Sequence, residues 1–128
     1  MKIWINSSTN QPNFGRTVKK LGKSLKSELD GIYAIQFQPN TCRLKMRMYY
    51  QLTDNPDSFR ELHLFIDIAT YQDKLRINII EDTANEQTLG QIILTEQQAN
   101  NFNDVRKKVL NCIEKSISKK YGNFDYVY

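Results

Sequence analysis

The most regular pattern of charged side chains is a row of three cations and a tyrosine at alternate positions: Arg43, Lys45, Arg47 and Tyr49. The positions next to them are apolar or aromatic: Cys42, Leu44, Met46, Met48, Tyr50 and Leu52. Strict alternation predicts a half-buried strand whose outward residues are about 6.6–6.8 Å apart. Cations at that spacing suit an extended phosphate backbone, so the row predicts a surface for a polyanion.

Two further alternating segments add side chains to the same predicted face. Residues 61–69 place His63 and Phe65 outward, and residues 74–80 place Lys74, Arg76 and Asn78 outward. Aromatic rings stack on unpaired bases, and a flat sheet suits splayed bases better than a duplex groove. We therefore predict a non-catalytic face for single-stranded DNA or RNA, built from Arg43, Lys45, Arg47, Tyr49, His63, Phe65, Lys74, Arg76 and Asn78. The alternative is a solvated face whose charges prevent edge-to-edge aggregation.

The distribution of charge along the chain favours the same interpretation. Residues 1–50 hold nine Lys/Arg and two acids, whereas residues 51–128 hold nine Lys/Arg and twelve acids, for a net charge of +4. A basic half joined to a mildly acidic half indicates a surface that faces a polyanion. Chance clustering on an ordinary charged surface is the other explanation.

Little in the sequence predicts catalysis. The chain has one histidine, and it contains neither a phosphate-binding glycine-rich loop nor a nucleophile elbow. Asp67, Glu81 and Asp82 are the candidate Mg²⁺ ligands of a nuclease, although such acids more often solvate strand ends. Cys42 and Cys112 read as small apolar residues. We expect no enzyme, no metal and no cofactor.

The sequence also bears on the compartment. No apolar run approaches the roughly 20 residues that span a bilayer, and residues 1–11 lack the apolar core of a signal peptide. We expect a soluble protein of the cytoplasm or another non-secreted compartment, without a membrane partner.

Two helical patterns flank the strands. Apolar residues at spacings of three and four predict a helix that starts near Asn13 and stops before Gly31; they are Phe14, Val18, Leu21, Leu25 and Leu29. Its other faces are basic, which suits nucleic acid, a membrane or plain solvent. A second helix is expected over residues 95–120, with Thr95 and Gln98 as a capping box.

The remaining segments complete a meander. Lys2–Ile5 is a candidate first strand, and residues 32–38 are a strand with Tyr33, Ile35 and Phe37 on one side. Residues 54–57 read as a loop, 72–73 as a tight turn and 89–94 as a short strand.

The predicted fold class is therefore α+β. We expect an antiparallel β-meander of four to five strands with one N-terminal and one long C-terminal helix packed on one face. The single domain 1–128 divides into an N-terminal strand and helix (1–31), the meander (32–94), the C-terminal helix (95–120) and an aromatic tail (121–128).

The end of the meander resembles a known family. Over residues 62–108, the strand end and helix start carry Gly90, Leu94, Thr95, Glu96, Gln97 and Phe102. This arrangement resembles the positive-cofactor-four-like single-stranded-DNA-binding proteins, and the element order is similar to Pur-alpha repeats and half of a Whirly domain. The resemblance implies a sheet-face nucleic-acid site and a homodimer packed through the last helix. The helix within residues 1–31 departs from the shortest members of the family.

The aromatic tail supports a second function. Tyr121, Phe124, Tyr126 and Tyr128 end the chain. A tail of this kind can insert into a protein partner, or it can fold back over its own sheet. The alternative function is therefore a protein–protein interaction module acting through the tail or the sheet face.

Overall fold

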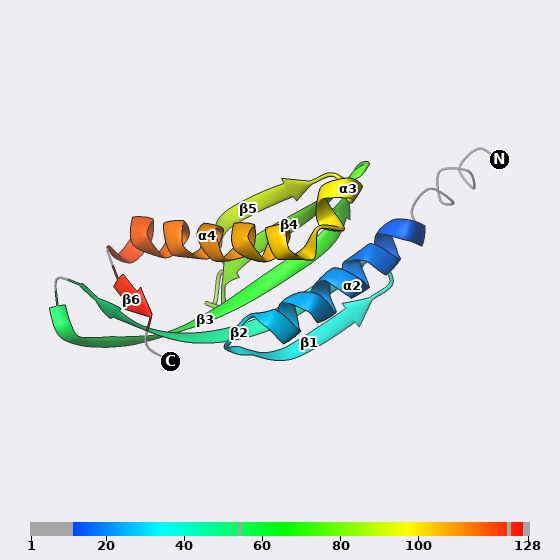
Figure 1. Cartoon of the computed structure of the whole chain (residues 1–128). Coiled ribbons are helices and arrows are strands. Elements are labelled where there is room, and N and C mark those ends of the chain that lie inside the picture. Colours follow the sequence, from blue (N-terminus) through cyan, green and yellow to red (C-terminus); the bar gives the residue numbers. More distant parts are fainter. Residues whose placement is uncertain (1–11, 54, 123, 127–128) are drawn as a thin grey trace.

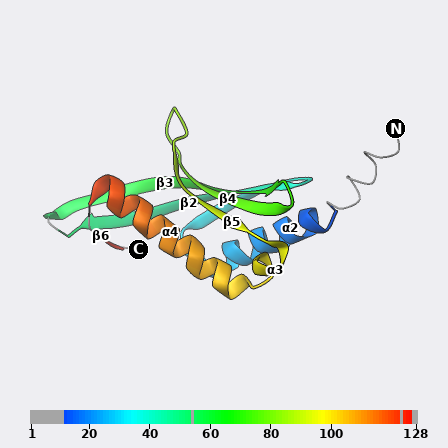
Figure 2. The same cartoon turned by 90° about the horizontal axis from the view of Figure 1, so that it is seen from above.

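The computed structural model describes residues 12–53, 55–122 and 124–126, and it places two long helices on one side of an antiparallel sheet (Figures 1 and 2). The elements are α2 (Pro12–Glu28), β1 (Ile32–Gln38), β2 (Thr41–Leu52), β3 (Asn55–Tyr71), β4 (Lys74–Glu81), β5 (Thr88–Leu94), α3 (Glu96–Ala99), α4 (Phe102–Tyr121) and β6 (Phe124–Tyr126). The strands pair in the order β1-β2-β3-β4-β5, and β6 also pairs with β2. The predicted α+β class and meander are confirmed. The candidate strand Lys2–Ile5 lies outside the described residues.

The central pair of strands follows from the alternation in the sequence. Nine inward side chains of β2 and β3 are buried: Cys42, Leu44, Met46, Met48, Tyr50, Leu62, Leu64, Ile66 and Ile68. The register sets Lys45 opposite Phe65 and Arg43 opposite Asp67. Because side chains alternate between the two faces of a strand, this register turns the predicted basic row to the face opposite the core.

Each helix contributes one apolar stripe to a single core. Val18, Leu21, Leu25 and Leu29 of α2, and Val105, Val109, Ile113 and Ile117 of α4, are all buried. Gly22 lets α2 approach β2 closely, since a Cβ there would lie 2.6 Å from the Sγ atom of Cys42. None of the described helices combines the length and the apolar character needed to cross a bilayer.

The expected helix over residues 95–120 is two helices. The capping box is present: Gln98 N–H donates to Thr95 Oγ1 at 3.1 Å, and Thr95 N–H donates to Gln98 Oε1 at 2.9 Å. The capping box starts α3, which ends at Ala99 with Asn100 as its C-cap. The Asn101 side chain then caps α4 by accepting from Asp104 N–H at 3.3 Å. Asparagine side chains compete for backbone hydrogen bonds in this way, so the prediction of one helix was wrong at the Asn-Asn pair.

The start of β3 and the alternation within β1 also differ from expectation. Leu52 pairs with Asn55, so residues 55–57 belong to β3 and the predicted loop is shorter. A register shift between Ile32 and Ala34 interrupts the alternation of β1. As a result, Tyr33 does not share a face with Ile35, because its ring lies beside Arg47 on the other side of the sheet.

The described part of the aromatic tail folds back onto the protein's own sheet. Residues 124–126 pair through the backbone with residues 50–52 of β2. The Tyr121 ring lies 6.0 Å from that of Tyr50, and its hydroxyl donates to Glu81 Oε2 at 2.8 Å. This arrangement is one of the two that the sequence left open for the tail.

Candidate nucleic-acid interface

Both long helices pack on one side of the sheet, and we call the opposite side the open face (Figure 2). The strand registers turn all nine predicted site residues toward it, from β2, β3 and β4. The connection between β4 and β5 projects from the sheet on this same side (Figure 2). The open face is therefore bounded on one side by the projecting β4–β5 connection.

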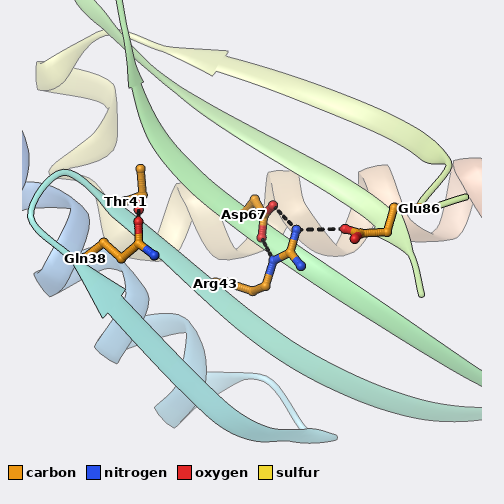
Figure 3. Close-up of polar contacts among 5 residues, drawn as sticks. All are labelled: Gln38, Thr41, Arg43, Asp67 and Glu86. Carbon is orange, nitrogen blue, oxygen red and sulfur yellow. Dashed lines mark hydrogen bonds and ion pairs between the residues drawn. The ribbon is translucent and has the colours of Figure 1, made fainter. Parts of the chain in front are cut away.

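The first cluster on the open face is centred on Arg43. Its Nε and Nη2 atoms donate to the two carboxylate oxygens of Asp67 at 2.7 and 2.8 Å, and Nη2 also donates to Glu86 Oε1 at 3.0 Å (Figure 3). The guanidinium carbon lies 4.1 Å from the centre of the Phe65 ring, which is buried. The hydrogen bonding of Arg43 to the Asp67 carboxylate is the main cause that raises the pKa of Arg43. The charge of Arg43 is therefore neutralised by two carboxylates, and Phe65 is buried beneath its guanidinium.

The second cluster is centred on Arg47, whose side chain is half exposed. Its guanidinium carbon lies 5.8 Å from the Tyr33 ring centre and 6.0 Å from that of Tyr49. Glu61 is a loose partner, because its Oε1 atom is 3.8 Å from Arg47 Nε and 3.2 Å from His63 Nε2. Tyr33 and Tyr49 are 54% and 39% exposed, so their rings are available for stacking.

The third cluster joins Arg76 to Tyr71, at the far end of β3 and β4. The guanidinium carbon of Arg76 lies 4.7 Å from the Tyr71 ring centre, and that tyrosine is 40% exposed. Arg76 Nε is buried and has no hydrogen-bond partner. Lys74 is exposed and pairs across the strands with Tyr71, whereas Asn78 Oδ1 accepts from Gln91 Nε2 at 3.1 Å.

Six residues of these clusters were missing from the predicted site: Tyr33, Glu61, Asp67, Tyr71, Glu86 and Gln91. The bulge in β1 hid Tyr33, and Tyr71 belongs to an extension of β3 beyond the predicted strand. Glu61 was visible in the alternation, two residues before His63 on the same face. Glu86 reaches Arg43 from the loop after β4, a contact between distant residues that no local pattern indicates.

The structure separates the acids considered as Mg²⁺ ligands. Asp67 lies on the open face and pairs with Arg43. Glu81 instead points into the core layer, where Lys120 and Tyr121 donate to its carboxylate. Among residues 12–53, 55–122 and 124–126, no group of three His, Cys, Asp or Glu side chains is placed to hold a metal ion.

Comparisons of the chain with protein-family models, with curated proteins and with solved structures found no match. The resemblance to the positive-cofactor-four-like proteins stays a prediction. So does the homodimer, and the apolar stripe of α4 packs within its own chain.

Proposed function

We propose that this protein binds single-stranded DNA or RNA on the open face without catalysis. The observation that supports this most strongly is the pairing of exposed tyrosines with arginines, at Arg47 with Tyr33 and Tyr49, and at Arg76 with Tyr71. Tyrosine rings stack on unpaired bases at about 1–3 kcal/mol per base. Arginine adds a phosphate contact and a cation–π contribution at the same place.

The two tyrosine–arginine clusters are separated by a distance that a short strand can span. Arg47 lies opposite His63, and Tyr71 is eight residues further along β3. At about 3.4 Å per residue, the separation along β3 is roughly 27 Å. Lys45 lies between the clusters on β2 and is in none of the ion pairs of the described residues. A strand that crosses both clusters would therefore pass a further cation.

The shape of the open face favours a single strand over a duplex. The β4–β5 connection projects on this side of the sheet (Figure 2). A rigid duplex laid across the sheet would meet this projection, whereas a single strand can bend beside it. Protein interaction through the tail ranks second to nucleic-acid binding. The reason is that Tyr121 already donates to Glu81 and β6 already pairs with β2 within the protein's own fold.

Fluorescence anisotropy with labelled 15-nucleotide dT and U oligonucleotides tests this proposal. We expect submillimolar binding at 50 mM salt, weaker binding at higher salt as counterion release becomes less favourable, and weaker binding of a matched duplex. Absence of binding at 50 mM salt would refute single-strand binding. A clear preference for duplex would refute the stacking account.

A further inference from the structure

A pocket of about 380 Å³ lies on the open face above Ala69. Ala69 is the smallest side chain in its cross-strand row, with Thr41 on one side and Arg76 on the other. The side chains around it are longer and polar, and they form the walls: Gln36, Gln38, Arg43, Asp67, Arg76 and Asn78. A small outward residue between long neighbours therefore creates a polar hollow in the sheet surface.

The charges lining this pocket leave one cation unmatched. Both carboxylate oxygens of Asp67 accept from Arg43, and Arg43 also donates to Glu86 (Figure 3). Arg76 is in none of the ion pairs of the described residues, and its Nε is buried without a hydrogen-bond partner. Stacking on Tyr71 holds its guanidinium in place. A guanidinium without an ion-pair partner in the wall of this pocket favours a ligand that brings a negatively charged acceptor.

The amides in the walls present donors as well. Asn78 Oδ1 already accepts from Gln91, and Gln38 Oε1 accepts from the Thr41 hydroxyl at 3.5 Å (Figure 3). Their NH₂ groups are donors that remain for a ligand. The acceptor edge of guanine is also satisfied by donors alone, but it is neutral, whereas a phosphate oxygen carries the negative charge that pairs with a guanidinium.

We propose that this pocket binds one phosphodiester group of the single strand, with Arg76 as its cation and the amides of Gln38 and Asn78 as neutral donors. This inference rests on the proposed function and adds a defined binding site for one backbone phosphate. The phosphodiester carries one negative charge, which matches the one unpaired guanidinium. The stacking sites at Tyr71 and Tyr49 then lie on either side along the sheet.

Chemical-shift mapping of the ¹⁵N-labelled full chain with dimethyl phosphate, a phosphodiester monoanion, tests the pocket directly. We expect saturable shifts around Ala69 and Thr41 that are lost in Arg76→Gln and kept in Lys107→Gln, which removes an exposed cation on α4. Ala69→Leu keeps Arg76 but fills the hollow, and it should abolish the same shifts. Each spectrum also reports whether the variant is folded.

An oligonucleotide titration then separates the pocket from the proposed function. We expect Arg76→Gln to weaken oligonucleotide binding about 5-fold at 0.1 M salt and to reduce the slope of log K against log salt by about 0.7. If Arg76→Gln and Ala69→Leu both bind the oligonucleotide as tightly as the original chain, the phosphate site in the pocket is refuted and single-strand binding is not. Dimethyl phosphate shifts at Ala69 without any oligonucleotide binding would support an anion pocket and remove the proposed function. Equal shifts with acetate, or none with dimethyl phosphate, would overturn the phosphodiester assignment.

Discussion

Replacing both Lys45 and Arg47 with glutamine should weaken oligonucleotide binding about 25-fold at 0.1 M salt. Each phosphate contact on a single strand releases about 0.7 counterion, which at this salt concentration contributes about 1 kcal/mol, or about 5-fold. Lys45 is in none of the ion pairs of the described residues, and Arg47 Nε is 3.8 Å from Glu61 Oε1, beyond hydrogen-bonding distance. Both cations are therefore available to phosphates, and both point away from the core.

Anisotropy titrations with a labelled 15-nucleotide dT strand at 50, 100 and 200 mM salt measure this effect. Losing two contacts should reduce the slope of log K against log salt by about 1.4. The matched control is Lys107→Gln with Lys115→Gln, which removes the same charge from exposed positions of α4. If the control loses as much affinity as the β2 variant, or if the slope of the β2 variant is unchanged, the assignment to the open face is refuted.

Three further predictions concern the fold beneath the interface. Arg43→Gln breaks the part-buried pair with Asp67 and should cost about 1–2 kcal/mol of unfolding free energy; an unchanged urea midpoint would contradict this. Burial raises the pKa of Cys42 to about 11, with Asp67 adding to the effect. Its alkylation at pH 8 should therefore be at least about 100-fold slower in the native chain than in urea, and similar rates would show that the thiol is accessible. Glu81→Gln removes a buried carboxylate that accepts from Lys120 and Tyr121. It should cost about 1–3 kcal/mol in the same urea assay, and a neutral result would mean that these bonds add nothing to stability.

The meander and the direction of the basic row were predictable because both depend on local alternation. The period of two from Cys42 to Leu52 indicates a strand, and it assigns Arg43, Lys45 and Arg47 to one face. The apolar stripe of α2 likewise gave its buried face correctly. Such patterns reflect which side of an element meets the core, and the chain carries that information residue by residue.

The state of charge of the open face was not predictable, because it depends on pairs of residues distant in sequence. Arg43 appeared as a free cation, yet Asp67 and Glu86 neutralise it from 24 and 43 residues away. The bulge in β1 moved Tyr33 onto the face, and one shifted residue reverses the orientation of a side chain. The sequence indicated which face carries cations, whereas the structure shows which cations are unpaired.

Photo-cross-linking tests the central claim most directly, because it identifies the residues that contact the bases. A 15-nucleotide strand containing 5-iodouracil is bound at 50 mM salt and irradiated, and the cross-linked peptides are identified by mass spectrometry. We predict cross-links at the exposed tyrosines of the open face, Tyr33, Tyr49 and Tyr71. Cross-links confined to α2 or α4, on the other side of the sheet, would contradict the proposal that the open face binds the strand.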